Sequence, residues 1–492
     1  MDLPAAPITP PHTAPLTARI AQRIQDQIER GALPGGAKLP SIRQYAASQK
    51  VSIHTVVEAY DRLVASGWIH SRPHQGFYVR PRPGDAPAAA PRGRDTPADF
   101  DGMWYFSGVF EPRAMNQLPG CGWLPADWGL EQTLRRSLRH LSTDLPKLNG
   151  YGHPRGHPPL CQWLVDMHAG RELALKPDQV LLTHGASQGL DLCVRSLVRI
   201  GDAVLVDDPG YANLLFMLRL QGARLLGVPR TAQGYDLDRL EALCQQHRPK
   251  VFFTQPRLQN PTGSTASLGQ LHRLLQIAHQ HDLTLVENDI YADLDSAHRP
   301  SLASLDQLAR VIHIHSFSKT ITPNLRVGYV LAHPLQIRHL AALKMASGLT
   351  SSELSERLTL HVLLEGRWRK HLLRLRERLA QAHVHTAQWL TALGFELFAQ
   401  PQAGLFLWAR HPLIAHSQAL AQAAARERIL LGPGDLFQAQ AQTDGAPPSP
   451  WLRFNVSFSL DAALPQFLSD HLSRRDPARA PAKKDPGPAG VT

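Results

Sequence analysis

The 492-residue sequence predicts an α/β protein in which a small module of helices and a β-hairpin precedes a large domain with a mostly parallel sheet. Three observations support this prediction. The chain is too long for one ordinary hydrophobic core. Residues 16–80 combine helical apolar spacing with two short strand-like runs. Residues 100–472 alternate short apolar runs with longer helical segments, a pattern typical of parallel strands joined by helical crossovers.

In the small module, three helices and two strands follow one another along the chain. Apolar residues recur every four positions between Leu16 and Glu29 and mark one face of a first helix. Ser41 is suited to cap a second helix, and Ser52 is suited to cap a third. Runs 68–72 and 76–79 indicate a hairpin. Three helices and a hairpin make a winged helix-turn-helix, whose third helix enters the DNA major groove with its N-terminal side chains foremost.

In the large domain, five short apolar runs indicate buried strands, and longer segments separate them. These runs are residues 180–182, 203–206, 251–253, 283–286 and 311–314. The segments on either side of this domain have a different composition. Residues 81–99 are rich in Pro and Ala and predict a linker, and residues 473–492 predict a disordered basic tail.

The formal net charge is +11, and most of it lies near the N-terminus. Between Leu16 and Arg94 there are 12 Lys and Arg against 5 Asp and Glu, so +7 of the +11 lies in the module and linker. This concentration suits the neutralisation of phosphates and predicts double-stranded DNA as a partner. Arginine-rich proteomes also contain many basic enzymes, so the charge alone leaves both classes of protein open.

The four cysteines lie far apart and show no paired spacing, which argues against a disulfide framework and against a metal site. The N-terminus shows no signal-peptide pattern, and no apolar run reaches membrane-spanning length. We therefore expect a cytoplasmic protein without a membrane partner.

The small module resembles the GntR-type DNA-binding domain over residues 16–80. The resemblance rests on Leu39-Pro40-Ser41-Ile42-Arg43, on the run from Val51 to Val57, and on Gly67-Trp68 with His74-Gln75-Gly76. It implies DNA contacts from the second helix, the start of the third helix and the wing tip, at Arg43, Ser52, His54, Thr55, Gln75 and Gly76.

One position departs from the GntR pattern. Where the family commonly has an arginine, this chain has Ile53. An arginine there would contact guanine, and an isoleucine has no donor for that contact. Ile53 therefore either packs within the module or meets a thymine methyl group.

Residues 316–329 are the most informative run of the large domain. Lys319 lies between small hydroxyl residues, and Arg326 follows seven positions later. Ser316, Ser318 and Arg326 can bind an anion while Lys319 supplies the amine of a Schiff base. The run resembles the lysine segment that binds pyridoxal 5'-phosphate (PLP) in fold-type I aminotransferases. The resemblance implies that fold for residues 100–472, PLP as cofactor and Lys319 as the catalytic residue.

Upstream of this run, Gly185, Ala186 and Ser187 follow a predicted strand and open a predicted helix. Their amides and the Ser187 hydroxyl can face an anion at the positive end of the helix. This segment therefore completes the predicted phosphate site.

Further residues match the aminotransferase pattern in the same order along the chain. The resemblance implies that Tyr211 stacks on the pyridine ring and that Asn260 and Tyr291 bind the ring oxygen. It also implies that Tyr151 reaches the phosphate of a neighbouring subunit, which requires a dimer. Arg453 would bind the α-carboxylate of an amino acid, because its guanidinium can form two bonds to a carboxylate.

A second departure concerns the pyridine nitrogen. The family has an aspartate three residues before the position of Tyr291, and this chain has Asn288 there, followed by Asp289. An aspartate keeps the nitrogen protonated and makes the ring an electron sink. If Asn288 faces the ring, carbanion chemistry should be poor. If the loop slips by one residue, Asp289 restores the charge, and the sequence leaves both alternatives open.

The layout of a winged helix joined to an aminotransferase-like domain resembles the MocR subgroup of GntR-type transcriptional regulators. The resemblance implies a bacterial, nucleoid-associated homodimer that binds an operator and carries PLP as an aldimine on Lys319. Its effector would be PLP itself or an amine or amino acid. Two alternatives remain: an active aminotransferase with an appended DNA-binding module, and a DNA-binding protein that has lost the cofactor.

Overall fold

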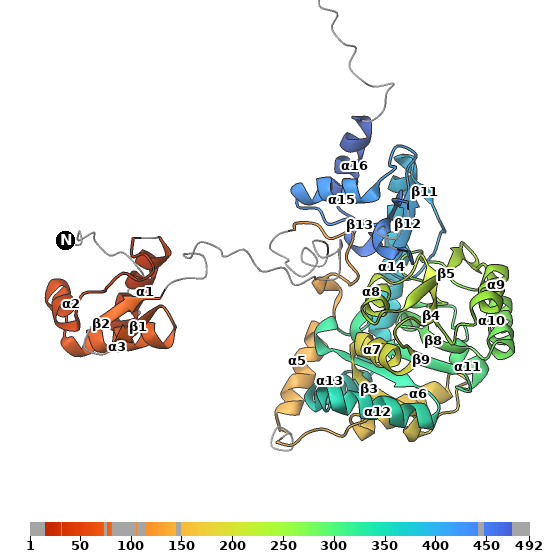
Figure 1. The fold of residues 1–492 in the computed structure, drawn as a ribbon, viewed down its shortest axis with the longest axis horizontal. Coiled ribbons are helices and arrows are strands. Elements are labelled where there is room, and N and C mark those ends of the chain that lie inside the picture. The colour runs from red at the N-terminus through yellow and green to blue at the C-terminus, as the bar shows by residue number, and fades with distance from the viewer. Residues whose placement is uncertain are drawn as a thin grey trace, which may run out of the picture. The chain divides into compact units, whose positions relative to one another are not determined.

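The computed structural model describes residues 15–30, 32–72, 76–80, 105, 115–143, 149–440 and 447–474. The chain divides into two compact units, residues 1–99 and 100–492 (Figure 1). The predicted linker, Gln75 and most of the predicted tail lie outside the described residues.

The first unit contains three helices and one antiparallel hairpin, as predicted. They are α1 (Leu16–Glu29), α2 (Ile42–Gln49), α3 (Ile53–Ala65), β1 (Ile69–Arg72) and β2 (Gly76–Val79). Ser41 begins α2 through a capping box, in which its hydroxyl accepts from the Gln44 amide and the Gln44 side chain accepts from the Ser41 amide. Ser52 begins α3 by accepting from the Thr55 amide. The caps thus set where both helices start.

The second unit is built on an eight-stranded sheet with the strand order β3-β10-β9-β8-β7-β4-β5-β6. The strands are β3 (Val180–His184), β4 (Ala203–Asp208), β5 (Arg224–Thr231), β6 (Gly234–Tyr235), β7 (Val251–Thr254), β8 (Thr284–Asn288), β9 (Val311–Ser316) and β10 (Val327–Leu331). Strands β5, β4, β7, β8 and β9 pair in parallel, whereas β10 is antiparallel to both of its neighbours. The predicted class, an α/β fold with a mostly parallel sheet, is therefore confirmed.

Helices cover both faces of this sheet (Figure 1). One face packs against α7 (Gly185–Leu197), α8 (Ala212–Leu220) and α12 (Pro334–Gly348). The opposite face packs against α6 (Pro158–Ala169), α9 (Leu237–His247), α10 (Leu268–Gln280) and α11 (Leu302–Asp306). In β8, Val286 packs on the face that α7, α8 and α12 cover, and Leu285 packs on the opposite face. This alternation decides which face each following side chain reaches.

A smaller antiparallel sheet lies toward the C-terminus, in the order β11-β12-β14-β13. Its strands are β11 (Glu396–Leu397), β12 (Phe406–Arg410), β13 (Gly432–Pro433) and β14 (Trp451–Asn455). The remaining helices of the unit are α5 (Glu131–Leu141), α13 (Glu353–Leu364), α14 (Arg367–Ala392), α15 (Ser417–Arg426) and α16 (Ala463–Ser473).

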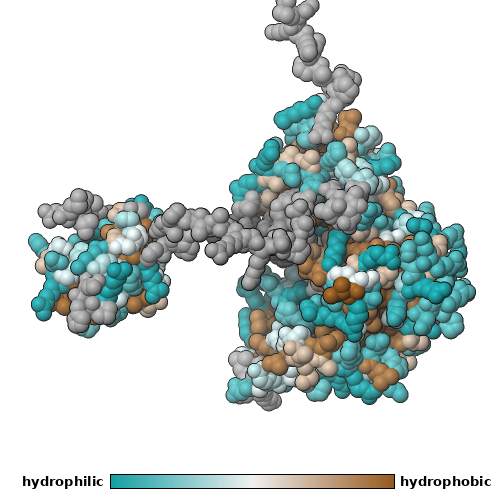
Figure 2. Space-filling model, in the orientation of Figure 1, coloured by the Kyte–Doolittle hydropathy of each residue, from teal (hydrophilic) through white to brown (hydrophobic). Residues whose placement is uncertain are grey.

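In the view of Figure 2, hydrophilic residues cover most of the visible surface of each unit, and hydrophobic residues are scattered among them. Among the residues that the structure describes, no helix combines the length and the apolar character needed to cross a membrane.

Candidate functional site

Most of the predicted cofactor residues lie at one edge of the large sheet. Strands β3, β4, β7, β8 and β9 run in the same direction, so their carboxyl ends meet at this edge. The residues that follow or end these strands include Gly185, Tyr211, Asn260, Asn288 and Lys319. Such an edge is the usual ligand site of open α/β sheets.

A cradle for an anion forms where the start of α7 meets Arg326. Gly185 has a φ of +72°, and a Cβ atom on it would lie 2.5 Å from Arg326 Nη2. Arg326 Nη2 donates to the carbonyl oxygen of His184 at 3.3 Å, so the guanidinium lies against the first turn of the helix. Ser316 Oγ donates to Ser318 Oγ at 2.9 Å beside this turn. A guanidinium, hydroxyl groups and a helix N-terminus together fit a phosphate.

The remaining residues of the α7 start also belong to the cradle. Ala186 and Ser187 lie in the first turn of α7, whose amides have no partner within the helix. The Ser187 hydroxyl interacts with the phenol of Tyr211. The helix start thus connects the predicted phosphate site to the predicted ring site.

We predict that Gly185→Ala weakens PLP binding by at least about tenfold, because the new methyl group would displace the Arg326 guanidinium. Binding is measured by absorbance titration of the cofactor-free protein. Gly201→Ala is the matched control, since Gly201 also has a positive φ, +84°, but has nothing within 4 Å of a new Cβ. Equal affinities for the two variants would contradict the assignment of the cradle.

Lys319 ends the short 3-10 helix η5 (Phe317–Lys319), and its Nζ donates to the carbonyl oxygen of Gly122 at 2.6 Å. Removal of the amine from solvent lowers the pKa of Lys319 to about 8, and the charges of Arg453 and Arg326 act in the same direction. A lower pKa leaves more of the amine neutral near pH 7, which is the form that attacks an aldehyde. The lysine is therefore suited to covalent chemistry.

Arg453 on β14 carries a buried positive charge, with 5% of the residue exposed. Its Nη1 donates to Asn260 Oδ1 at 2.8 Å, and its Nη2 donates to the Tyr105 hydroxyl at 2.9 Å and to the Gly120 carbonyl oxygen. All of these partners are neutral. Within the part of the chain that the structure describes, Arg453 Nε has no hydrogen-bond partner. A buried cation without an anionic partner is costly, so the site favours a carboxylate ligand.

Two aromatic residues of the predicted ring site accompany Arg453. Tyr291 is buried and packs edge-on against Phe406, and the guanidinium of Arg453 lies 4.5 Å from the centre of the same Phe406 ring. Burial raises the pKa of Tyr291 and of Tyr211, so both phenols stay neutral and can donate hydrogen bonds. The structure thus brings Asn260, Tyr291 and Arg453 together.

The sequence prediction missed Tyr105 and residues 120–122, which complete this site. The Tyr105 hydroxyl donates to the carbonyl oxygen of Gly120. Asn455 Nδ2 holds the same segment by donating to the carbonyl oxygens of Cys121 at 3.1 Å and Trp123 at 2.7 Å. The contacts of Arg453 with Tyr105 and of Asn455 with Cys121 join residues more than 300 positions apart in sequence, and no local pattern around Tyr105 indicates them.

Asn288 and Asp289 point to opposite faces of the sheet. Asn288 lines a narrow cavity together with Tyr211 and Gln255. Asn288 Oδ1 and Gln255 Nε2 are buried there without a hydrogen-bond partner among the described residues, which fits a polar ligand group. Asp289 forms an ion pair with Arg257 at 3.1 Å instead. Of the two residues, Asn288 therefore shares a cavity with Tyr211, the residue predicted to stack on the ring.

On the face of the sheet opposite to Asn288, Asp289 belongs to a buried polar cluster. Its carboxylate lies within 4.8 Å of ligand atoms of Glu287 and His313, a grouping that could hold a metal ion. Glu287 already accepts from the amides of Leu302 and Ala303 and contacts His313 Nδ1 at 2.9 Å. Since these contacts satisfy Glu287, the cluster is explained by its own hydrogen bonds and ion pairs.

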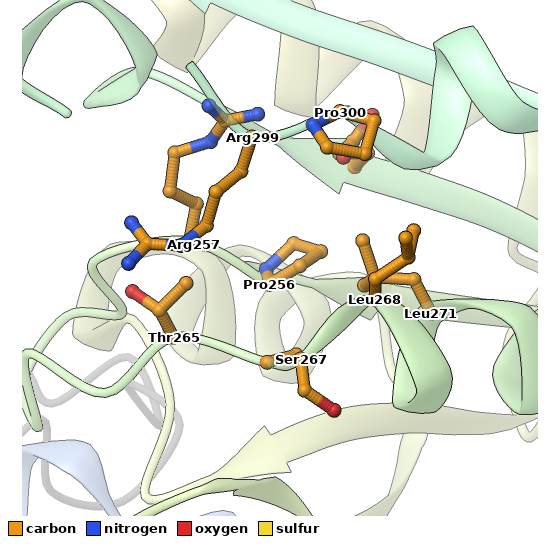
Figure 3. A pocket seen from close by; sticks show the side chains of 10 residues that line it. Pro256, Arg257, Thr265, Ser267, Leu268, Leu271, Arg299 and Pro300 are labelled. Atoms are coloured by element: carbon orange, nitrogen blue, oxygen red, sulfur yellow. The ribbon is translucent and has the colours of Figure 1, made fainter. Parts of the chain in front are cut away.

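A pocket of about 160 Å³ lies next to this cluster. Figure 3 shows Arg257 and Arg299 at one end of it and the apolar side chains of Leu268, Leu271 and Pro300 at the other. The two arginines pair with aspartates, Arg257 with Asp289 and Asp295, and Arg299 with Asp295. None of the predicted cofactor residues lines this pocket.

Tyr151 and the predicted DNA contacts lie at the surface of their units. Tyr151 is 84% exposed, as a residue that reaches a second chain would be. Arg43, Ser52 and His54 are exposed, and Thr55 is half-buried at the start of α3. Gly76 has a φ of +99° at the start of β2. Gln75 lies outside the described residues.

Comparison with known proteins identifies both units. Residues 126–468 match the family of class I and II aminotransferases, and residues 16–79 match the gntR family of bacterial regulatory proteins. The uncharacterized HTH-type transcriptional regulator YdcR of Escherichia coli K12 is 29% identical, over 89% of this chain and 94% of its own. The probable rhizopine catabolism regulatory protein MocR of Rhizobium meliloti is 28% identical, over 85% and 86%.

Among solved structures, the α-aminoadipate aminotransferase LysN of Thermus thermophilus is similar, with a TM-score of 0.66 and 27% identity. The match covers 74% of this chain and 92% of LysN. That crystal structure holds N-(5'-phosphopyridoxyl)-L-leucine, which joins a PLP-derived group to an amino acid.

Proposed function

This chain belongs to the class I and II aminotransferase family and carries a domain of the gntR family of bacterial regulatory proteins, and from this premise we propose that it is a MocR-type transcriptional regulator that responds to PLP or to an amino compound. One observation carries the proposal. A helix-turn-helix with an exposed start of its third helix shares one chain with a site that combines an anion cradle, a lysine and a buried arginine.

PLP, the cofactor of this family, supplies an aldehyde that condenses with amines and a ring that accepts electrons. Lys319 would provide the protein amine, and its lowered pKa keeps part of it neutral near pH 7. The start of α7 and Arg326 would hold the phosphate. The hydroxyl groups that assist them would be those of Ser187, Ser316 and Ser318.

The other polar residues of the site would orient the ring and the effector. Asn260 and Tyr291 would hold the ring oxygen, and Tyr211 would stack on the ring. Arg453 would bind the carboxylate of an amino acid, which supplies the anion that this buried guanidinium lacks. Asn288 would face the ring nitrogen without a negative charge to keep it protonated, and this supports sensing rather than rapid turnover.

An effector would act by shifting a conformational equilibrium of the DNA-binding homodimer. It can shift the equilibrium only by its difference in affinity for the two states, and a tenfold difference corresponds to about 1.4 kcal/mol. Tyr151, which is 84% exposed, would reach the phosphate site of the second subunit. As a regulator of this class, the protein would work in the cytoplasm, at the chromosome.

The direct test is a footprint on DNA upstream of the protein's own gene, with and without PLP and a panel of amines and amino acids. The proposal expects a protected operator whose occupancy changes with PLP or with one class of amine. Protection that no compound changes would contradict sensing, and the absence of any protected site would contradict regulation.

An aminotransferase with an appended DNA-binding module is the second candidate, and the similarity to LysN favours it. The two functions differ in their kinetics. Incubation with amino acids and a keto acid should give sustained turnover for an enzyme, and a single half-reaction or none for a sensor.

We predict that Arg43→Ala weakens DNA binding and flattens its salt dependence. Arg43 is exposed on α2, where it is expected to contact the DNA. The slope of log K against log salt concentration should fall by about 0.9 for each phosphate that the variant no longer binds. Fluorescence anisotropy at several salt concentrations measures the slope, and an unchanged slope would reject a phosphate contact. Arg30→Ala provides a matched comparison, because Arg30 is likewise exposed and lies at the C-terminal end of α1.

A further inference from the structure

We propose that Ile53 contacts the C5 methyl group of a thymine in the major groove and thereby selects that base in the operator. The inference rests on the proposed DNA-binding function and deepens it. Ile53 occupies the first position of α3, where a recognition helix presents side chains to base edges.

The exposure of Ile53 argues against a packing role. The residue is 54% exposed, whereas Val56, Ala59 and Tyr60 of the same helix are fully buried. Ile53 is also absent from the apolar cluster formed by the helices and the hairpin of this unit. The sequence allows Ile53 either to pack within the module or to meet a thymine methyl group. Its exposure argues against packing and favours contact with a partner.

The charge of the module and the neighbours of Ile53 on α3 favour DNA as that partner. Between residues 16 and 80, nine Lys and Arg stand against four Asp and Glu, an excess that suits a phosphate backbone. The Ser52 hydroxyl bonds to the Thr55 amide at 3.1 Å and contacts Thr55 Oγ1 at 2.7 Å, so the first turn that carries Ile53 is held in place. His54, next to Ile53, is exposed as well and offers a polar contact at the same helix end.

The chemistry of the groove then selects the base. Isoleucine can neither donate nor accept a hydrogen bond, and the thymine methyl is the apolar group that bases present in the major groove. Burial of one methyl group contributes about 0.8 kcal/mol, which corresponds to about a fourfold change in affinity. A protein that makes this contact should therefore bind thymine about fourfold more tightly than uracil at one position of each half-site.

The experiment uses the full chain with PLP and a duplex obtained by selection from a random-sequence pool. Each thymine of the selected site is replaced in turn by deoxyuridine, which removes the methyl group and keeps the hydrogen-bonding edges. Affinities are measured by fluorescence anisotropy for the native chain, Ile53→Ala and Leu16→Ala. Leu16 is a matched control, because it is 45% exposed at the start of α1.

We expect one position at which uracil weakens binding of the native chain and of Leu16→Ala about fourfold, but leaves Ile53→Ala unaffected. If Ile53→Ala no longer binds measurably, Ile53→Val replaces it, and its penalty should be smaller than that of the native chain. In a separate selection, Ile53→Arg should change the preferred base at this position to guanine.

Two results would overturn parts of the proposal, and they are distinguishable. Uracil penalties that are the same in the native chain and in the Ile53 variants would show that Ile53 does not contact a thymine methyl. A selection that returns no preferred sequence would instead contradict the proposed DNA-binding function itself.

Discussion

Lys319→Ala should abolish the absorption band of protein-bound PLP and the response of DNA binding to the effector. Lys319 Nζ lies beside Gly122 and the charge of Arg453, and it is the amine placed at the ring site. Without it, PLP can be held only by weaker contacts to the phosphate and the ring. Absorbance spectra of the purified variant after incubation with PLP, and gel shifts with and without PLP, measure both effects.

The matched control for this variant is Lys250→Ala, which removes an exposed lysine of the same unit. The control should keep both the absorption band and the response. A Lys319→Ala protein that retains the full band would contradict the assignment of the covalent amine. A native protein that stays colourless after incubation with PLP would contradict the cofactor proposal as a whole.

The pH dependence gives a second measurement of the same amine. Only the neutral form reacts, and with a pKa of about 8 its fraction rises about tenfold between pH 7 and pH 9 and then levels off. The rate of PLP incorporation into cofactor-free protein should follow this curve. A rate that still rises steeply above pH 9 would indicate an amine with an ordinary lysine pKa.

Asn288→Asp should increase the rate of the transamination half-reaction, on the order of tenfold or more. The new carboxylate would lie in the cavity with Tyr211 and Gln255 and would keep the ring nitrogen protonated, which makes the ring a stronger electron sink. Stopped-flow absorbance after mixing with a panel of L-amino acids measures the rate.

Asp289→Asn provides the comparison that decides between the two neighbouring positions. Asp289 pairs with Arg257 at 3.1 Å on the opposite face of the sheet, so its loss should leave the half-reaction unchanged. It should nevertheless lower the free energy of unfolding, by less than the about 3–5 kcal/mol that a buried charge left without any partner costs, because Arg257 keeps its ion pair with Asp295 at 3.6 Å. If Asp289→Asn alone changed the half-reaction, the assignment of Asn288 would be wrong.

Elements with local signals were predictable from the sequence. The starts of α2 and α3 follow from Ser41 and Ser52, because capping involves residues only three positions apart. The parallel strands β4, β7, β8 and β9 follow from short apolar runs separated by helical segments. Strand β10 was missed, because it follows the lysine segment closely and runs antiparallel to both of its neighbours.

The amino-acid sequence by itself determined the two-unit α/β organisation, the lysine segment and the candidate phosphate, ring and DNA residues, since these depend on short patterns of residue type. Only the tertiary structure decided that Asn288 rather than Asp289 lines a cavity with Tyr211, that Tyr105 and Gly120 contact Arg453, and that Ile53 is exposed. The physical reason is that a side chain's face, its distant partners and its burial depend on strand alternation and on packing between segments far apart in the chain.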